Sequence, residues 1–193
     1  MTPPLILASS SRYRRELLTR LGIAFAVEAP GVTENYLPGE APQTRALRLA
    51  AAKADAVADR HPDAVVIGSD QVAATATGVL DKPGTASRAR EQLARLSGHS
   101  AHFLTAVSIR HQKAGINLDH METVAVHFRQ LSALEIDRYV AREQPLDCAG
   151  SFRSEALGIT LFTAVESRDP TALIGLPLIW VADALRKAGY ELP

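Results

Sequence analysis

The chain has 193 residues, of which 47% are hydrophobic and 22% are charged, so it has the composition of a globular protein and not of a disordered one. Lys plus Arg and Asp plus Glu each number 21, and this zero net charge argues against a protein that coats nucleic acid or an anionic membrane. A single cysteine, Cys148, excludes an internal disulfide framework, and no apolar run is long enough for a membrane span.

The first part of the chain predicts a strand, a capped helix and a long loop. Residues 5–8 form a short apolar run that is typical of a buried strand and not of a signal peptide, so we expect a cytoplasmic protein. The serines at 9–11 can each cap the helix that follows, which ends at Gly22. At such a helix N-terminus the free N–H groups and the helix dipole favour an anion. Residues 30–42 are expected to form a loop.

The middle of the chain predicts a helix followed by a central strand. Residues 44–60 are rich in Ala and Leu, and Lys53 lies among their apolar positions. The side chains of this helix that are expected to face the core are Ala46, Leu47, Ala50, Ala54 and Val57. Residues 64–68 form a continuous apolar run, typical of a central strand, and residues 69–71 are expected where that strand ends.

The second half adds strands and helices that complete an α/β pattern. Ser132 and Glu135 have the spacing of a capping box, which predicts a helix that stops before Pro145. The other expected helices are 86–96 and 178–188, and the expected strands are 99–109, 122–128 and 159–165. This order predicts an α/β fold, with a mixed twisted sheet, flanking helices and two lobes around a deep cleft, in one domain spanning residues 1–193.

Two groups of polar residues fit phosphate chemistry. Ser9 and Arg14 lie at the first predicted helix N-terminus, where an arginine fork can match phosphate oxygens; a capped helix with solvated arginines is the alternative. Asp70 follows a buried strand, where α/β sheets place ligand chemistry, and it can hold a divalent metal or accept a proton from water. A turn aspartate is the alternative for Asp70.

Three further charged residues are candidates with equally simple alternatives. Lys53 and Lys82 can reach phosphates as point charges, or else Lys53 snorkels at the edge of its helix and Lys82 lies on the surface. Glu34, in the predicted loop, can supply a second carboxylate to a metal, or else it is a surface residue. The motifs of P-loop, Rossmann, α/β-hydrolase and zincin proteins are absent from the sequence.

The chain resembles the Maf family of nucleotide pyrophosphatases through five short stretches in a fixed order. These stretches are LASSS at 7–11 with Arg14 and Arg15, IGSDQV at 67–72, DKP at 81–83, AGSFRSE at 149–155 and LIGLP at 173–177. Each stretch alone is a weak motif, but their order and spacing hold over nearly the whole chain. The family usually has Pro where this chain has Arg12.

The resemblance implies an enzyme that cleaves a nucleoside triphosphate to the monophosphate and pyrophosphate, with a divalent metal, Mg²⁺ or Mn²⁺. It implies that Asp70 is the catalytic carboxylate and accepts the proton of the attacking water. It also implies that Glu34 is a further acid at the metal, and that the protein forms a homodimer. The positions that match the family's phosphate-binding residues are Ser9, Arg14, Lys53 and Lys82.

Three positions distinguish subgroups of the family, and in this chain they are Tyr13, Gln71 and Glu155. The subgroup that acts on dTTP and UTP has Arg, Thr and Gln there, whereas the one that acts on 7-methyl-GTP has an aromatic residue, Gln and Glu. Methylation at N7 makes guanine cationic, so an aromatic face attracts it by about 0.5–2 kcal/mol. A carboxylate such as Glu155 can accept the N1 and N2 hydrogens of guanine, but it would be repelled by the carbonyls of uracil or thymine.

The sequence therefore predicts a cytoplasmic protein that hydrolyses 7-methyl-GTP and has a small nucleotide as its partner, with no membrane and no stable nucleic-acid binding. One alternative is an enzyme for dTTP, UTP or another modified nucleotide. The other is a nucleotide-binding regulator of cell division, which would retain its ligand without releasing pyrophosphate.

Overall fold

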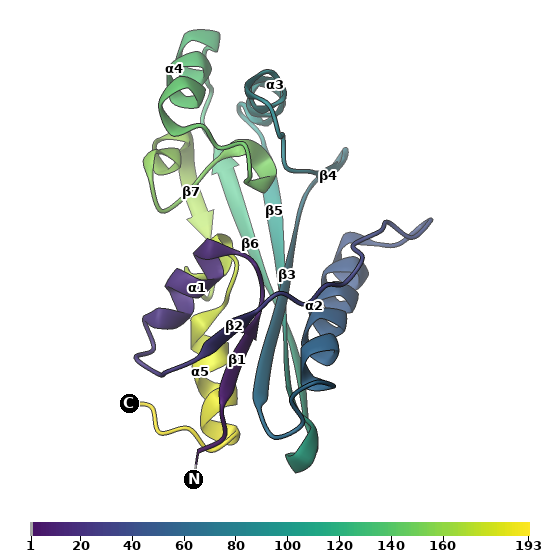
Figure 1. The fold of residues 1–193 in the computed structure, drawn as a ribbon. Coiled ribbons are helices and arrows are strands. Elements are labelled where there is room, and N and C mark those ends of the chain that lie inside the picture. Colours follow the sequence, from purple (N-terminus) through teal and green to yellow (C-terminus); the bar gives the residue numbers. More distant parts are fainter. Residues whose placement is uncertain (1) are drawn as a thin grey trace. The chain divides into compact units, whose positions relative to one another are not determined.

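The computed structural model describes residues 2–193, which form a mixed α/β fold with seven strands and five α-helices (Figure 1). The strands are β1 (Leu5–Ala8), β2 (Ala26–Glu28), β3 (Val65–Thr75), β4 (Gly78–Leu80), β5 (Ser100–His111), β6 (Ile116–Phe128) and β7 (Phe162–Glu166). The α-helices are α1 (Arg12–Thr19), α2 (Pro42–Ala58), α3 (Ala86–Leu96), α4 (Ala133–Glu143) and α5 (Leu178–Lys187). The short 3-10 turns are η1 (Gln112–Ala114), η2 (Ala149–Ser151), η3 (Leu157–Leu161) and η4 (Ala172–Ile174). The predicted fold class, a mixed sheet with flanking helices, is confirmed.

The described residues form two compact units. Unit 1 comprises the chain up to Gln71, Thr105–Glu122 and Asp169–Pro193, whereas unit 2 comprises Val72–Leu104 and Thr123–Arg168. Unit 1 therefore contains β1, β2, α1, α2, η1, η4 and α5, and unit 2 contains β4, α3, α4, η2, η3 and β7. The long strands β3, β5 and β6 contribute residues to both units.

The strands follow the order β2-β1-β3-β5-β6-β7, with β4 paired to β3. Strand β1 is parallel to β2 and β3, whereas β4 is antiparallel to β3 and β7 is antiparallel to β6. The last pair between β1 and β3 joins Ala8 to Gly68. Strand β3 therefore continues past the carboxyl end of β1, and this end of a parallel strand is where α/β sheets commonly bind ligands.

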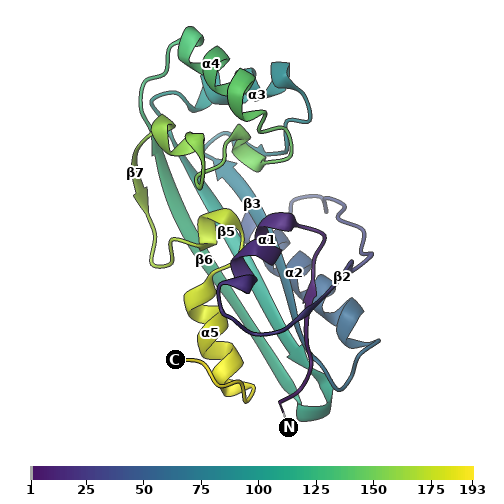
Figure 2. The ribbon, with the colours of Figure 1, turned by 60° about the vertical axis from the view of Figure 1, so that its left-hand side comes forward.

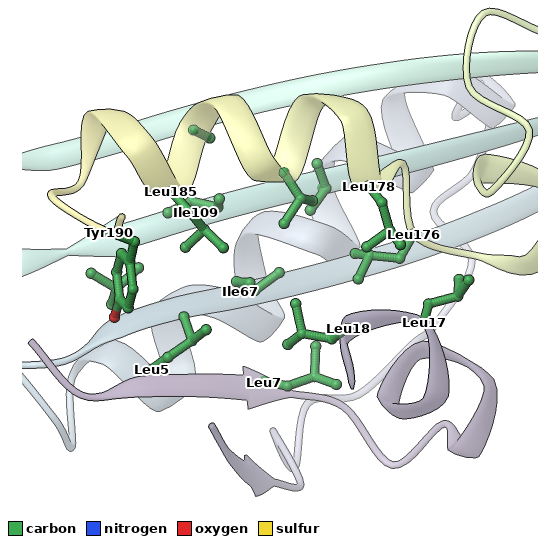
Figure 3. Packing of buried hydrophobic residues seen from close by; sticks show 14 residues of the cluster. Leu5, Leu7, Leu17, Leu18, Ile67, Ile109, Leu176, Leu178, Leu185 and Tyr190 are labelled. Carbon is green, nitrogen blue, oxygen red and sulfur yellow. The ribbon is translucent and has the colours of Figure 1, made fainter. Parts of the chain in front are cut away.

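Both faces of the unit 1 sheet are covered, which explains the uninterrupted apolar runs of β1 and β3. Helices α1 and α5 lie on one side of these strands and α2 lies on the other (Figures 1 and 2). On the first side, Leu7 and Ile67 pack with Leu185 of α5 and their neighbours (Figure 3). On the other side, Ile6 and Val66 pack with α2. Successive residues of each strand thus enter different cores, as the two-residue repeat of a strand requires.

Helix α2 approaches β3 very closely at Gly68. A Cβ atom at this position would lie 2.4 Å from the carbonyl oxygen of Ala50 and 2.5 Å from the amide nitrogen of Ala54. Backbone atoms cannot give way cheaply, so only glycine permits this packing. The close approach brings the side chain of Lys53, on α2, next to Asp70, two residues beyond Gly68 on β3.

Unit 2 has a core of its own, in which Phe152 makes edge-to-face contacts with Phe103, Phe128 and Phe162 at centroid distances of 4.8–5.6 Å. The predicted helix 86–96 is confirmed with its bounds, and its apolar residues Ala89, Leu93 and Leu96 are buried.

The predicted capping box that starts α4 is also confirmed. The backbone N–H of Ser132 donates to the Glu135 carboxylate, and the backbone N–H of Glu135 donates to the Ser132 hydroxyl. These bonds, with that from Arg129, lower the pKa of Glu135 to about 2.

Several predicted bounds were wrong. Helix α2 begins at Pro42 and not at 44, because proline suits the first helical position, and Leu49 is buried where Leu47 was expected. The predicted strand 122–128 is the end of a longer strand, β6. The predicted strand 159–165 begins only at Phe162, because the preceding five residues form η3. An apolar run does not by itself distinguish these two conformations.

Candidate functional site

The centre of the candidate site is a lysine between two carboxylates. The Nζ atom of Lys53 lies 2.6 Å from Oδ1 of Asp70 and 2.6 Å from Oε1 of Glu34. The Lys53 and Asp70 side chains are 7% and 9% exposed, whereas that of Glu34 is 53% exposed. One ammonium group is therefore paired with a buried and an accessible carboxylate, and the structure brings together three residues that are far apart in sequence.

Asp70 lies within a strand and not at the end of one, so this part of the prediction was wrong. Strand β3 continues to Thr75 because its polar side chains find partners inside the protein: Ser69 donates to the carbonyl oxygens of Ala106 and Gly175, and Asp70 accepts from Lys53. Satisfied polar groups can be buried at little cost, so the polar residues do not end the strand. Asp70 instead lies two positions beyond the last pair between β1 and β3.

The predicted helix N-terminus follows β1 directly. Ser11 is the N-cap of α1, and its hydroxyl accepts the backbone N–H of Arg14 at 3.4 Å. Ser9 is buried, and its hydroxyl accepts the backbone N–H of Ser11 at 3.1 Å. The two serines thus order the turn between β1 and α1, where the helix dipole favours negative charge.

Arg14 is anchored at this turn by a carbonyl group from the far end of the chain. Its Nε atom donates to the carbonyl oxygen of Gly175 at 2.9 Å. Gly175 has a φ of +123°, a backbone conformation that favours glycine. Burial lowers the pKa of Arg14, while the charges of Asp70 and Glu34 act in the opposite direction. Arg14 therefore belongs to the same electrostatic cluster as the two carboxylates.

The side chain of Gln71 is held by the chain around η4. Its Nε2 atom lies 2.8 Å from Oγ1 of Thr105 and 3.1 Å from each of the carbonyl oxygens of Ala172 and Leu173. The Thr105 hydroxyl in turn donates to the carbonyl oxygen of Ala172 at 2.9 Å. All four residues belong to unit 1, as do Lys53 and Asp70.

Tyr13 lies in the first turn of α1 with a cation already beside it. The guanidinium carbon of Arg12 is 4.7 Å from the centroid of the Tyr13 ring, and Nη2 of Arg12 donates to the Tyr13 hydroxyl at 2.6 Å. The residue that replaces the family's usual proline thus makes a cation–π contact, which the sequence prediction missed.

Lys82 and Glu155 belong to unit 2. Lys82 is exposed and follows β4, and Glu155 is exposed in the turn before η3. The hydroxyl of Ser154 donates to the Glu155 carboxylate at 3.4 Å. The preceding residue of the loop, Arg153, is held through its backbone N–H by the Tyr139 hydroxyl at 3.2 Å.

Two arginines of α2 hold the loop that carries Glu34, and sequence reasoning missed both. Arg45 lies 3.4 Å from the centroid of the Tyr36 ring and donates to the carbonyl oxygen of Glu34. Arg48 donates through two nitrogens to the carboxylate of Glu40, at 2.6 Å each, which lowers the pKa of Glu40. The signal in the sequence is two arginines three positions apart at the start of a helix that follows a loop with an acidic residue.

Known proteins are similar to this chain in sequence over nearly its whole length. The family model described as "Maf-like protein" matches residues 4–188. The chain is 55% identical, over 100% of both chains, to a protein of Xanthomonas campestris pv. campestris named 7-methyl-GTP pyrophosphatase. It is 53% identical to a protein of Alkalilimnicola ehrlichii with the same name, over 98% of this chain and 96% of that one. Among solved structures, the Staphylococcus aureus Ham1 protein is similar with a TM-score of 0.45 and 14% identity, over 65% of this chain and 71% of that chain.

Proposed function

Since this chain belongs to the Maf family, we propose that it is a nucleoside triphosphate pyrophosphatase that hydrolyses 7-methyl-GTP to 7-methyl-GMP and pyrophosphate. Two relatives that match it at 53–55% identity over nearly their full length carry this activity in their names. The proposed substrate is a small nucleotide. No helix among residues 2–193 has the length and apolarity that a bilayer span requires.

The observation that carries the proposal is the contact of Lys53 with both Asp70 and Glu34, beside Arg14 and the start of α1. A triphosphate needs positive charge around its oxygens, and hydrolysis needs a carboxylate near the attacked phosphorus. Lys53 and Arg14 provide the first, and Asp70 provides the second. Because the Glu34 side chain is 53% exposed, this cluster of charges can be reached from solvent.

The residues also fit a divalent metal. Within residues 2–193, no three His, Cys, Asp or Glu side chains gather around one point. Mg²⁺, however, is commonly held by only one or two carboxylates together with substrate phosphates, and Asp70 and Glu34 are two carboxylates that converge on a single cation, Lys53. We propose that these two residues would hold Mg²⁺ or Mn²⁺, which when bound supplies positive charge that stabilises the phosphate oxygens.

In the proposed reaction, Asp70 orients a water molecule and accepts its proton while the water oxygen attacks the α-phosphorus. The bond between the α-phosphorus and the oxygen that bridges to the β-phosphorus breaks, and pyrophosphate leaves with the bonding electrons. Lys53, Lys82 and Arg14 neutralise the charge that develops on the pyrophosphate, and Ser9 binds phosphate through its hydroxyl.

Base selection is proposed to depend on Tyr13, Gln71 and Glu155. Tyr13 suits this role because an aromatic face attracts the cationic base of 7-methyl-GTP. Glu155 would accept the N1 and N2 hydrogens of guanine. In a test, Glu155→Gln should reduce kcat/KM for 7-methyl-GTP more than for UTP, and an equal reduction for both would reject this assignment.

The proposed activity is tested with a panel of triphosphates, including 7-methyl-GTP, GTP, UTP and dTTP, with pyrophosphate and orthophosphate measured separately. We expect pyrophosphate and the monophosphate in equal amounts, fastest from 7-methyl-GTP. Asp70→Asn should lower kcat by about 10²–10⁴-fold while the protein still binds the nucleotide. Release of orthophosphate alone, or tight binding without turnover in the unmodified protein, would contradict the proposal.

A further inference from the structure

The carboxamide of Gln71 has a defined orientation, because the atoms around its nitrogen can only accept hydrogen bonds. The carbonyl oxygens of Ala172 and Leu173, each 3.1 Å away, have no hydrogen to donate. The hydroxyl of Thr105, 2.8 Å away, uses its one hydrogen for the carbonyl oxygen of Ala172. The atom of Gln71 at this place must therefore be the NH₂ group, since the amide oxygen would face three acceptors.

The oxygen of the same carboxamide, by contrast, is not held by hydrogen bonds from the described residues. In the part of the chain that the structure describes, Oε1 of Gln71 accepts no hydrogen bond, and it is not among the buried polar atoms that lack a partner. Gln71 itself is only partly buried and directly follows Asp70 in β3. The acceptor end of Gln71, one residue along β3 from the proposed catalytic carboxylate, is thus accessible, while its donor end is fully used.

We infer that Thr105, with the carbonyl groups of Ala172 and Leu173, locks Gln71 so that it reads the base of the substrate only as a hydrogen-bond acceptor. Thr105 is then a positioning residue for specificity, although it lies on β5 and in none of the stretches that carry the family resemblance. This inference rests on the proposed function and specifies it further. Gln71 should bind an N–H group of 7-methylguanine, such as its exocyclic amine, and not its carbonyl oxygen.

The first test measures how Gln71 is coupled to individual groups of the base. We compare kcat/KM for 7-methyl-GTP with that for 7-methyl-ITP, which lacks the exocyclic amine, and for the 6-thio analogue, whose sulfur is a poor acceptor. Each comparison is made for the unmodified enzyme and for Gln71→Leu, which keeps the size of the side chain. We expect the preference for 7-methyl-GTP over 7-methyl-ITP to fall roughly 3- to 10-fold in Gln71→Leu, because one hydrogen bond is lost.

Discrimination against the 6-thio analogue should be the same in both enzymes. If Gln71→Leu instead loses that discrimination and keeps the preference over 7-methyl-ITP, Gln71 acts as a donor and the inference is wrong. If neither preference changes, Gln71 does not read the base. Failure to hydrolyse 7-methyl-GTP in the unmodified enzyme would refute the proposed function as well, so the two failures can be distinguished.

The second test concerns the lock itself. Thr105→Val has nearly the same shape but no hydroxyl, and Thr105→Ser keeps the hydroxyl. Thr105→Val should lose part of the preference for 7-methyl-GTP over 7-methyl-ITP, and Thr105→Ser should keep it. A merely structural role would change kcat for both substrates by the same factor, and that result in a folded Thr105→Val protein would overturn the role of Thr105. If Thr105→Val does not fold, the Thr105→Ser enzyme is compared with Gln71→Leu. A folded Thr105→Ser enzyme that has lost the preference for 7-methyl-GTP over 7-methyl-ITP, as is expected of Gln71→Leu, contradicts the lock.

Discussion

Replacing Lys53 with methionine is the most direct test of the cluster at the centre of the site. Methionine has a similar length and volume, so the substitution removes the charge and leaves the packing of α2 nearly unchanged. It leaves the buried carboxylate of Asp70 without its hydrogen-bonded cation, 2.6 Å away in the unmodified protein. The accessible carboxylate of Glu34 loses the same partner but keeps its contact with water.

The expected loss of stability differs among three single substitutions. Removing one partner of a buried ion pair costs about 3–5 kcal/mol, so Lys53→Met should lower the free energy of unfolding by that amount. Glu34→Gln should cost about 0–1 kcal/mol because the Glu34 side chain is 53% exposed. Asp70→Asn should lie between them, since Lys53 would still be paired with Glu34. The double substitution Lys53→Met with Asp70→Asn should recover much of the loss, because no buried charge then lacks a partner.

The assay is urea unfolding followed by circular dichroism, with thermal melting as a second measurement. For a chain of this size, 1 kcal/mol corresponds to roughly 2–4 °C, so Lys53→Met should melt about 6–20 °C lower. A double variant that is less stable than Lys53→Met by the full cost of Asp70→Asn would show that the two residues do not interact. Equal stability of Lys53→Met and the unmodified protein would refute the assignment of Lys53 to a buried ion pair.

Three other substitutions test separate parts of the fold and the site. Gly68→Ala should destabilise the protein by about 3 kcal/mol in urea unfolding, because its Cβ would meet the carbonyl oxygen of Ala50 at 2.4 Å; an unchanged midpoint would contradict the close approach of α2. Arg14→Lys, which cannot reproduce the bond from Nε to Gly175, should reduce kcat/KM about 10- to 100-fold in a protein of unchanged melting temperature, whereas full activity would mean that charge alone suffices. The capping box lowers the pKa of Glu135 from 4.5 to about 2, so its stabilising effect is fully present above about pH 4.5 and is lost as the pH falls towards 2. Glu135→Gln should therefore show a smaller fall in the urea midpoint between pH 5 and pH 2 than the unmodified protein, and parallel curves would show that Glu135 does not contribute.

Local signals in the sequence predicted much of the fold because they have a local physical cause. The capping box at Ser132 and the apolar spacing of residues 86–96 depend only on neighbours within a turn or two, and both were confirmed. The extent of β3 could not be predicted in this way. Its polar residues are tolerated because of partners such as Lys53 and Ala106, which lie 17 and 37 positions away in the sequence.

The sequence pointed to the residues of the candidate site but not to the contacts among them. The position of Lys53 among apolar residues of a helix made it a candidate to bind phosphate, but the sequence did not indicate that Asp70 and Glu34 would meet at its nitrogen. That meeting depends on Gly68, which lets α2 approach β3, and on Arg45 and Arg48, which hold the loop of Glu34. These contacts join separate elements, and no local pattern encodes them.

The position of Asp70 has a general consequence for locating sites in mixed sheets. The expectation that ligand chemistry lies at the carboxyl end of a strand led to Asp70, although Asp70 lies inside its own strand. The relevant end is that of the neighbouring strand: β1 stops at Ala8, opposite Gly68, and leaves the next residues of β3 without a β1 partner. The first turn of α1 then lies near those residues, since Arg14 and Ser69 of β3 both donate to the carbonyl oxygen of Gly175. A strand that extends beyond the carboxyl end of its parallel neighbour can therefore carry a carboxylate in its middle. That carboxylate can then face a phosphate site at the end of the neighbouring strand.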